Sequence, residues 1–249
     1  MRRNPVFLWA IAMLAMALFA RLGFWQLERA DEKRQMLANA AAALSSRVPK
    51  PLSVISDATR ADGYDWIEIE GRFADAPAVL LDNQQKNGVV GVRAYRVFSM
   101  DDGQPLLVEL GWAALPGDRT MPAVSLGTAP RSMAGLLMPP PGKGLDVGPP
   151  AVLADGTLLA TTLDLPGLAA SLQAPRLAPR VLRPASAPDP GFVLDFDILP
   201  NTLPPERHLG YAVQWLGLAV TVLITALLLT WRARRTARRA ARRNEGPLS

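Results

Sequence analysis

The chain of 249 residues contains a single imidazole, that of His208, and no cysteine. Imidazole acts in proteins as a general base or as a metal ligand through one ring nitrogen. One histidine without cysteines cannot build a tetrahedral zinc site. A Ser-His-Asp triad needs the histidine beside a serine on a rigid scaffold, but His208 stands where a proline-bearing, charged stretch gives way to an apolar segment. These residue types argue against hydrolytic catalysis.

Two carboxylate pairs are the remaining candidates for acid-base chemistry. Glu68 and Glu70 alternate with apolar residues, and so do Asp195 and Asp197. This alternation predicts that each pair is solvated on the outer face of a half-buried strand. No glycine-rich phosphate loop follows a strand, so we expect a protein that is not an enzyme.

Two apolar segments must position His208. A membrane-spanning helix needs about 20 residues at a rise of about 1.5 Å per residue. Residues 208–231 meet this length, and residues 6–25 do so if Arg21 extends toward the headgroups. A cleaved signal peptide is the alternative for the first segment. Leu18 stands where its cleavage site needs a small residue, which favours an uncleaved anchor.

The charges predict how the two spans are oriented. Residues 1–5 and the tail 232–249 are basic, with seven arginines in the tail, whereas residues 26–207 carry a net charge of −4. The positive-inside rule places both termini in the cytoplasm and residues 26–207 in the periplasm, at a bacterial inner membrane. Anionic membrane lipids explain the arginines of the tail better than nucleic acid does.

Residues 26–207 show mainly the period of two that is typical of strands. In residues 66–73, Ile67, Ile69 and Phe73 alternate with charged residues, and residues 192–199 repeat the pattern. Turn signals such as Asn87-Gly88 separate further short apolar runs. Helix is expected from Leu27 to Ser46, as an extension of the first span, and at residues 164–173. The sequence therefore predicts an α+β membrane protein, in which two transmembrane helices flank a mostly antiparallel β-rich periplasmic domain.

Two sequence strings at the span ends are not explained by composition. Residues 22–33 read Leu-Gly-Phe-Trp-Gln-Leu-Glu-Arg-Ala-Asp-Glu-Lys, and residues 208–215 read His-Leu-Gly-Tyr-Ala-Val-Gln-Trp. Together they resemble the surfeit-locus family of cytochrome c oxidase assembly factors, and the order of the central segments is similar as well. The resemblance implies a helper in building a haem-copper oxidase, with the catalytic subunit and other assembly factors as partners. It leaves homo-oligomerisation open.

If this chain is a bacterial member of the family, the resemblance implies that haem a binds at the histidine of the second span. His208 would then supply one axial bond to the iron. Tyr211 and Trp215 follow at helical spacing on a shared face, and Arg207 could pair with a propionate. A second ligand would come from a partner, another copy or a methionine such as Met13 or Met16. The alternative function is a structural scaffold that steadies an oxidase intermediate and binds no cofactor.

The first span offers one further candidate, Trp25. Arg21, Trp25 and Glu28 form a stripe at i, i+4 and i+7. Anchoring at the headgroups is one explanation of this stripe. The other is that it packs on the second span beside His208 and Tyr211 and closes the same pocket.

Overall fold

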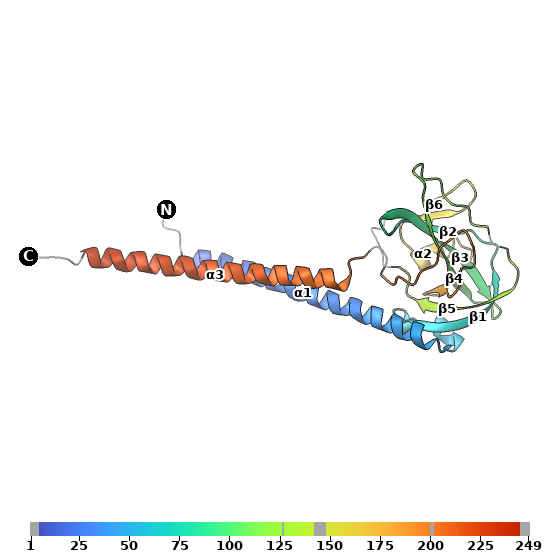
Figure 1. Cartoon of the computed structure of the whole chain (residues 1–249), viewed down its shortest axis with the longest axis horizontal. Helices are drawn as coiled ribbons and strands as arrows, with labels where there is room; N and C mark the ends of the chain where they lie inside the picture. Colours follow the sequence, from blue (N-terminus) through green and yellow to red (C-terminus); the bar gives the residue numbers. More distant parts are fainter. Residues whose placement is uncertain (1–4, 126, 142–147, 200–201, 245–249) are drawn as a thin grey trace, which may run out of the picture. The chain divides into compact units, whose positions relative to one another are not determined.

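The computed structural model describes residues 5–125, 127–141, 148–199 and 202–244. They form two compact units (Figure 1). The helical unit contains the chain up to Gln35 and from Leu203 onward, and the β domain contains Met36–Thr202.

Two long helices make up the helical unit: α1, Pro5–Ser46, and α3, Pro205–Asn244. Both are long and apolar enough to cross a membrane, and they include the two predicted apolar segments 6–25 and 208–231. α1 continues without a break through the charged residues 27–46, as the sequence predicts. A proline begins α3, at the position where the missing N–H is not needed for a helical hydrogen bond.

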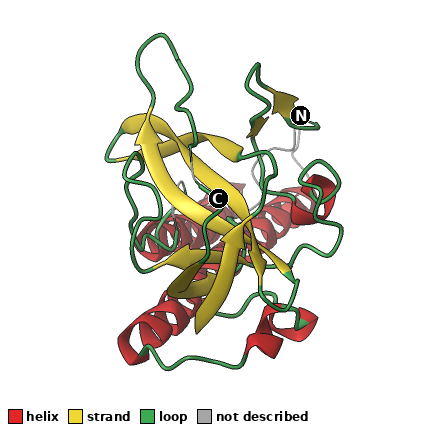
Figure 2. Cartoon of the chain, turned by 90° about the vertical axis from the view of Figure 1, so that its right-hand side faces the viewer, coloured by secondary structure: helices red, strands yellow, loops and turns green. Residues whose placement is uncertain are grey.

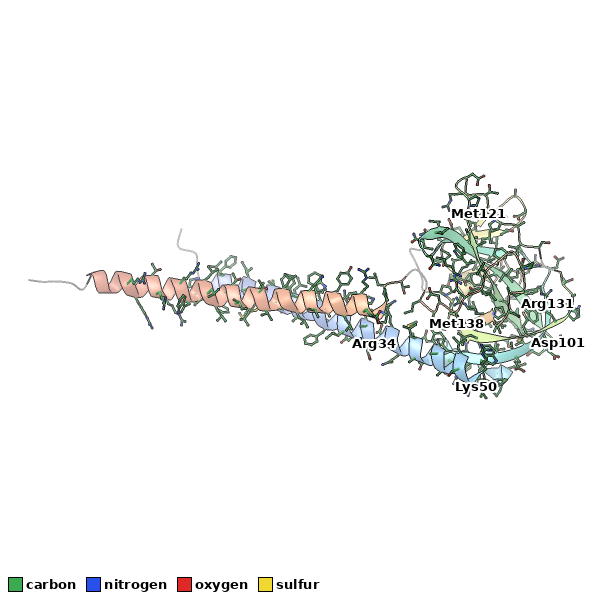
Figure 3. The ribbon with its side chains drawn as sticks, in the orientation of Figure 1. Arg34, Lys50, Asp101, Met121, Arg131 and Met138 are labelled. Atoms are coloured by element: carbon green, nitrogen blue, oxygen red, sulfur yellow. The ribbon has the colours of Figure 1, made fainter. Side chains whose placement is uncertain are left out.

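The β domain is built on one mixed sheet, in which the described strands follow the order β1-β5-β8-β4-β3-β2-β7-β6. Because β1 also pairs with β3, the strands β1, β5, β8, β4 and β3 form a closed ring, and Figure 2 shows its long strands strongly bent. All pairings are antiparallel except β2 with β7 and β4 with β8. The predicted α+β class is therefore correct. The strands are β1 (Asp65–Phe73), β2 (Val79–Lys86), β3 (Val89–Met100), β4 (Pro105–Ala114), β5 (Arg131–Met138), β6 (Ala151–Val152), β7 (Leu158–Ala160) and β8 (Val181–Pro184).

The expected period of two is confirmed in β1. Ile67, Ile69 and Phe73 are buried, and Glu68 and Glu70 are exposed. Asn87-Gly88 forms the turn between β2 and β3, with both residues at positive φ, as a tight hairpin requires. The last turns of α1 pack on the same domain, since Ala40 is buried in its core.

Two local predictions are wrong. Residues 192–199 form no strand apart from one bridge at Val193. Their carboxylates bond the local backbone instead: Asp195 accepts from the N–H of Asp197 at 3.1 Å, and Asp197 accepts from that of Leu199 at 3.1 Å. Such local bonds compete with a strand ladder. The predicted helix at 164–173 is shorter, since α2 covers only Leu165–Leu168.

Charged side chains are buried in the centre of the β domain. Glu109 in β4 is fully buried between two arginines: Arg93 donates to it at 2.5 Å and Arg183 at 3.0 Å. Asp195, expected to be solvated, bonds Arg93 at 3.2 Å and Lys86 at 2.8 Å. Burial alone would raise the pKa of Asp195, but the hydrogen bond from Lys86 and the charge of Arg93 lower it to about 2. Part of the core of the β domain therefore consists of paired charged side chains instead of apolar ones.

Removing the charge of Glu109 tests this account of the core. Glu109→Gln leaves two buried guanidinium groups without their shared anion, which should lower the free energy of unfolding by about 3 kcal/mol or more. Chemical denaturation of the detergent-solubilised full chain, followed by near-ultraviolet circular dichroism, measures the change. The control is Glu68→Gln on the exposed face of β1, expected to change stability by less than about 0.5 kcal/mol. Equal losses in the two variants would show that the buried pairs have no special role.

Candidate functional site

Each long helix of the helical unit has one buried stripe. On α1 it consists of Gly23, Gln26, Ala30 and Lys33, at i, i+3, i+7 and i+10. On α3 the buried residues are Pro205, His208 and Ala212, and the half-buried Trp215 continues the same spacing. Residues at these spacings share one face of a helix. The candidate site is the part of the unit where these two stripes contain polar side chains.

Contacts along the helical unit show that α1 and α3 run antiparallel. Near the start of α1, the indole N–H of Trp9 donates to the hydroxyl of Thr230 at 3.0 Å. Farther along, the rings of Phe19 and Trp215 stack with their centroids 5.7 Å apart. Successive residues of α1 thus contact successively earlier residues of α3, and this pairing continues to His208.

Gly23 allows the closest approach between the two helices. A Cβ atom at this position would lie 2.8 Å from Cγ of Leu216 and 3.6 Å from the carbonyl oxygen of Ala212. The Leu216 side chain and the α3 backbone thus occupy the space that glycine leaves open. Small residues at such crossings let membrane helices pack closely.

His208 is buried one turn beyond this crossing. Its side chain is 7% exposed, and its Nδ1 atom lies 2.7 Å from Oε1 of Gln26 on α1. Its other ring nitrogen, Nε2, is also buried and makes no hydrogen bond within the part of the chain that the structure describes. Buried polar atoms are nearly always paired, so an unpaired one in a native structure needs an explanation.

Cationic side chains occupy the next turns of α1. Lys33 is only 6% exposed and belongs to the same stripe as Gln26. Arg29 lies between them in sequence, is exposed, and forms an ion pair with Glu32 at 2.6 Å. Lys33 is therefore the cationic residue on the buried stripe of α1, while the Phe19–Trp215 end of the helix pair is apolar.

The structure separates the residues that the sequence grouped with His208. Trp215 faces α1 and stacks on Phe19. Tyr211 is 39% exposed and Arg207 is exposed, so neither lies on the buried stripe of α3. The reason is geometric: residues at i+3 and i+4 flank the helix axis on opposite sides, and here Ala212 rather than Tyr211 turns inward.

Of the two explanations for the stripe of Arg21, Trp25 and Glu28, packing on the second span is not supported by the exposure of these residues. All three are exposed, Trp25 by 48%. Successive residues of a helix point about 100° apart, so Gln26 faces inward although the preceding residue, Trp25, faces outward. Sequence reasoning missed Gln26 and Lys33 as site residues. The signal available in the sequence was the i, i+7 spacing of Gln26 and Lys33, which places both residues on one face of a helix.

Two helices are able to span a membrane, a β domain lies between them in sequence, and a buried histidine is bonded across the helix pair. These features are consistent with a two-pass membrane protein. Residues 13–220 match the model of the SURF1 family, so the chain belongs to that family of cytochrome oxidase assembly factors. No curated protein matches the chain.

A disulfide test checks the crossing at Gly23. The chain has no cysteine, so Gly23→Cys together with Leu216→Cys introduces the only possible pair. We expect a mild oxidant to form a disulfide between the two helices. After proteolysis of the chain between the helices, the two fragments should then stay joined until a reductant is added. The control pairs Leu216→Cys with Trp25→Cys, whose side chain points outward. Equal linking from both positions would contradict the packing.

Proposed function

We propose that this chain is a non-enzymatic assembly factor that holds haem a transiently at His208 and aids its insertion into the catalytic subunit of a haem-copper oxidase. The observation that carries the proposal is the buried Nε2 of His208, which has no hydrogen-bond partner among the described residues. An imidazole nitrogen with its lone pair available is a standard axial ligand of haem iron.

The residues at the site fit haem better than a bare metal ion. Haem brings four equatorial nitrogens of its own, so the protein needs to supply only axial bonds. No group of three His, Cys, Asp or Glu side chains that could hold an ion occurs in the described ranges. When bound, haem a would supply the iron and the electron chemistry, and this chain would contribute an axial nitrogen and the surroundings of the ring.

The polarity along the helix pair matches that of the ligand. Lys33 and Arg29 act on His208 from one side, and the stacked Phe19 and Trp215 lie on the other. Haem a has two propionates and a long apolar tail at different edges. We propose that Lys33 and Arg29 attract the propionates and that the apolar stretch of the helix pair accommodates the tail. The exposed Arg207 is the further candidate for a propionate.

A purely structural scaffold is the second candidate, and the burial of His208 favours it. The bond from His208 to Gln26 joins the two spans, and such bonds stabilise membrane helix pairs by about 0.6–2 kcal/mol. Nε2 is inaccessible in the described structure, so haem binding requires the neighbouring contacts to open. A scaffold needs no such opening.

Absorption spectra distinguish the two functions. The protein, purified from cells that make haem a, should show a Soret band that His208→Gly abolishes. Added imidazole should restore the band by replacing the lost ligand, which excludes misfolding as the cause of the loss. The control is Val213→Ala on the exposed face of α3, which should keep the pigment. Absence of pigment from the wild-type protein, with oxidase assembly still dependent on it, would favour the scaffold.

We further propose that the two helices cross a bacterial inner membrane, with both termini in the cytoplasm and the β domain in the periplasm. The support is the arginine-rich tail beyond the second span and the net negative charge of residues 26–207.

Reporter fusions test this orientation. Alkaline phosphatase fused after Lys50 should be active, because it requires the periplasm, and the same enzyme fused after Arg243 should be inactive. A green fluorescent protein fused at the same two positions should give the reverse result. Fluorescence after Lys50 would overturn the assignment of the compartment.

A further inference from the structure

We propose that Gln26 is a positioning residue that holds His208 in the tautomer protonated at Nδ1, so that Nε2 is the ring atom presented to iron. The tautomer follows from the contacts of the chain itself, and its role toward iron rests on the proposed function.

The hydrogen bond between the two side chains sets the tautomer. Nδ1 of His208 lies 2.7 Å from Oε1 of Gln26. An amide oxygen only accepts hydrogen bonds, so Nδ1 must carry the proton and donate. Nε2 is then left with its lone pair.

The opposite arrangement is disfavoured by burial. If the amide of Gln26 were reversed, its NH₂ group would donate to Nδ1, and the proton would reside on Nε2. That N–H would be buried without an acceptor among the described residues. A buried donor without an acceptor lowers the stability of the folded state by about 1–3 kcal/mol. Unpaired buried N–H groups are rarer in native proteins than unpaired acceptors. The arrangement with the proton on Nδ1 avoids this cost.

The neighbours of Gln26 restrict its movement. It is 9% exposed and lies on α1 between two other buried stripe residues, Gly23 and Ala30. The donor and the acceptor come from different helices, so the bond exists only while α1 and α3 are paired at this point. The direction of Nε2 therefore depends on helix pairing, and a separation of the helices would free the ring to rotate.

Hydrogen bonds of this kind tune metal-binding histidines in general. A ligating imidazole nearly always donates its other N–H to an oxygen, which fixes the ring and makes the ligand nitrogen more basic. Loss of such a partner lowers affinity by about 10–100-fold. The same loss of haem affinity is expected when Gln26 can no longer accept.

The single histidine makes the tautomer directly measurable. In the full chain labelled with [15N]histidine and free of haem, nuclear magnetic resonance should show one imidazole with a protonated Nδ1 and an unprotonated Nε2. Gln26→Leu should lose this preference, and Gln26→Glu should keep it because a carboxylate still accepts. The control Gln35→Leu removes an exposed glutamine that bonds Asp31 on the same helix, and it should leave the spectrum unchanged.

Titration of the same four proteins with haem a completes the test. Gln26→Leu should bind about 10–100-fold more weakly than wild type, and Gln26→Glu and Gln35→Leu should stay within a few-fold of it. A wild-type ring protonated at Nε2, or an unchanged tautomer in Gln26→Leu, would overturn the role of Gln26 even if haem binds. The expected tautomer in a wild-type protein that binds no haem a would instead overturn the proposed function and leave the positioning of the ring intact.

Discussion

The hydrogen bond between Gln26 and His208 is the contact on which the site depends. Within an apolar helix pair, a polar side chain has little water to bond, so it must find a partner on the other helix. Gly23 supports this bond by allowing α3 to approach, and Phe19 and Trp215 support it by stacking about two turns away. Because the bond uses Nδ1, it determines that Nε2 is the ring atom left for another partner.

Features governed by local patterns could be predicted from the sequence. The two spans follow from unbroken apolar length, and the buried face of β1 follows from the alternation around Ile67 and Ile69. The failure at Asp195 has a non-local cause in addition to the local hydrogen bond that its carboxylate accepts from Asp197. Its carboxylate bonds Arg93, which is 102 positions away, and Lys86. A pattern of alternating residues contains no information about such distant pairs, so the strand expected there was wrong.

For the site, the sequence identified His208 but not the residues around it. Its position at the start of an apolar segment was visible, and so was the family resemblance. The inward face of α1 was not, because an error of one residue turns a helix by about 100° and replaces Gln26 with Trp25. Aromatic residues at a membrane border attract attention in a sequence, whereas a single glutamine does not. Only the packing of α1 against α3 distinguishes the two.

Comparison with the other buried polar atoms supports a ligand role for Nε2. In the described residues, the remaining buried side-chain atoms without a hydrogen bond belong to Arg93, Arg180, Arg183 and Tyr95. Arg93 and Arg180 are ion-paired through another nitrogen, and Nη2 of Arg183 itself lies 2.9 Å from the carboxylate of Glu109. A guanidinium also has no lone pair to offer a metal. Burial, with the nearby charge of Glu109, raises the pKa of Tyr95, so its hydroxyl stays protonated. Among these atoms, only Nε2 of His208 is a nitrogen with the lone pair that the proposed ligand role needs, and the neighbouring contacts must open before it can be reached.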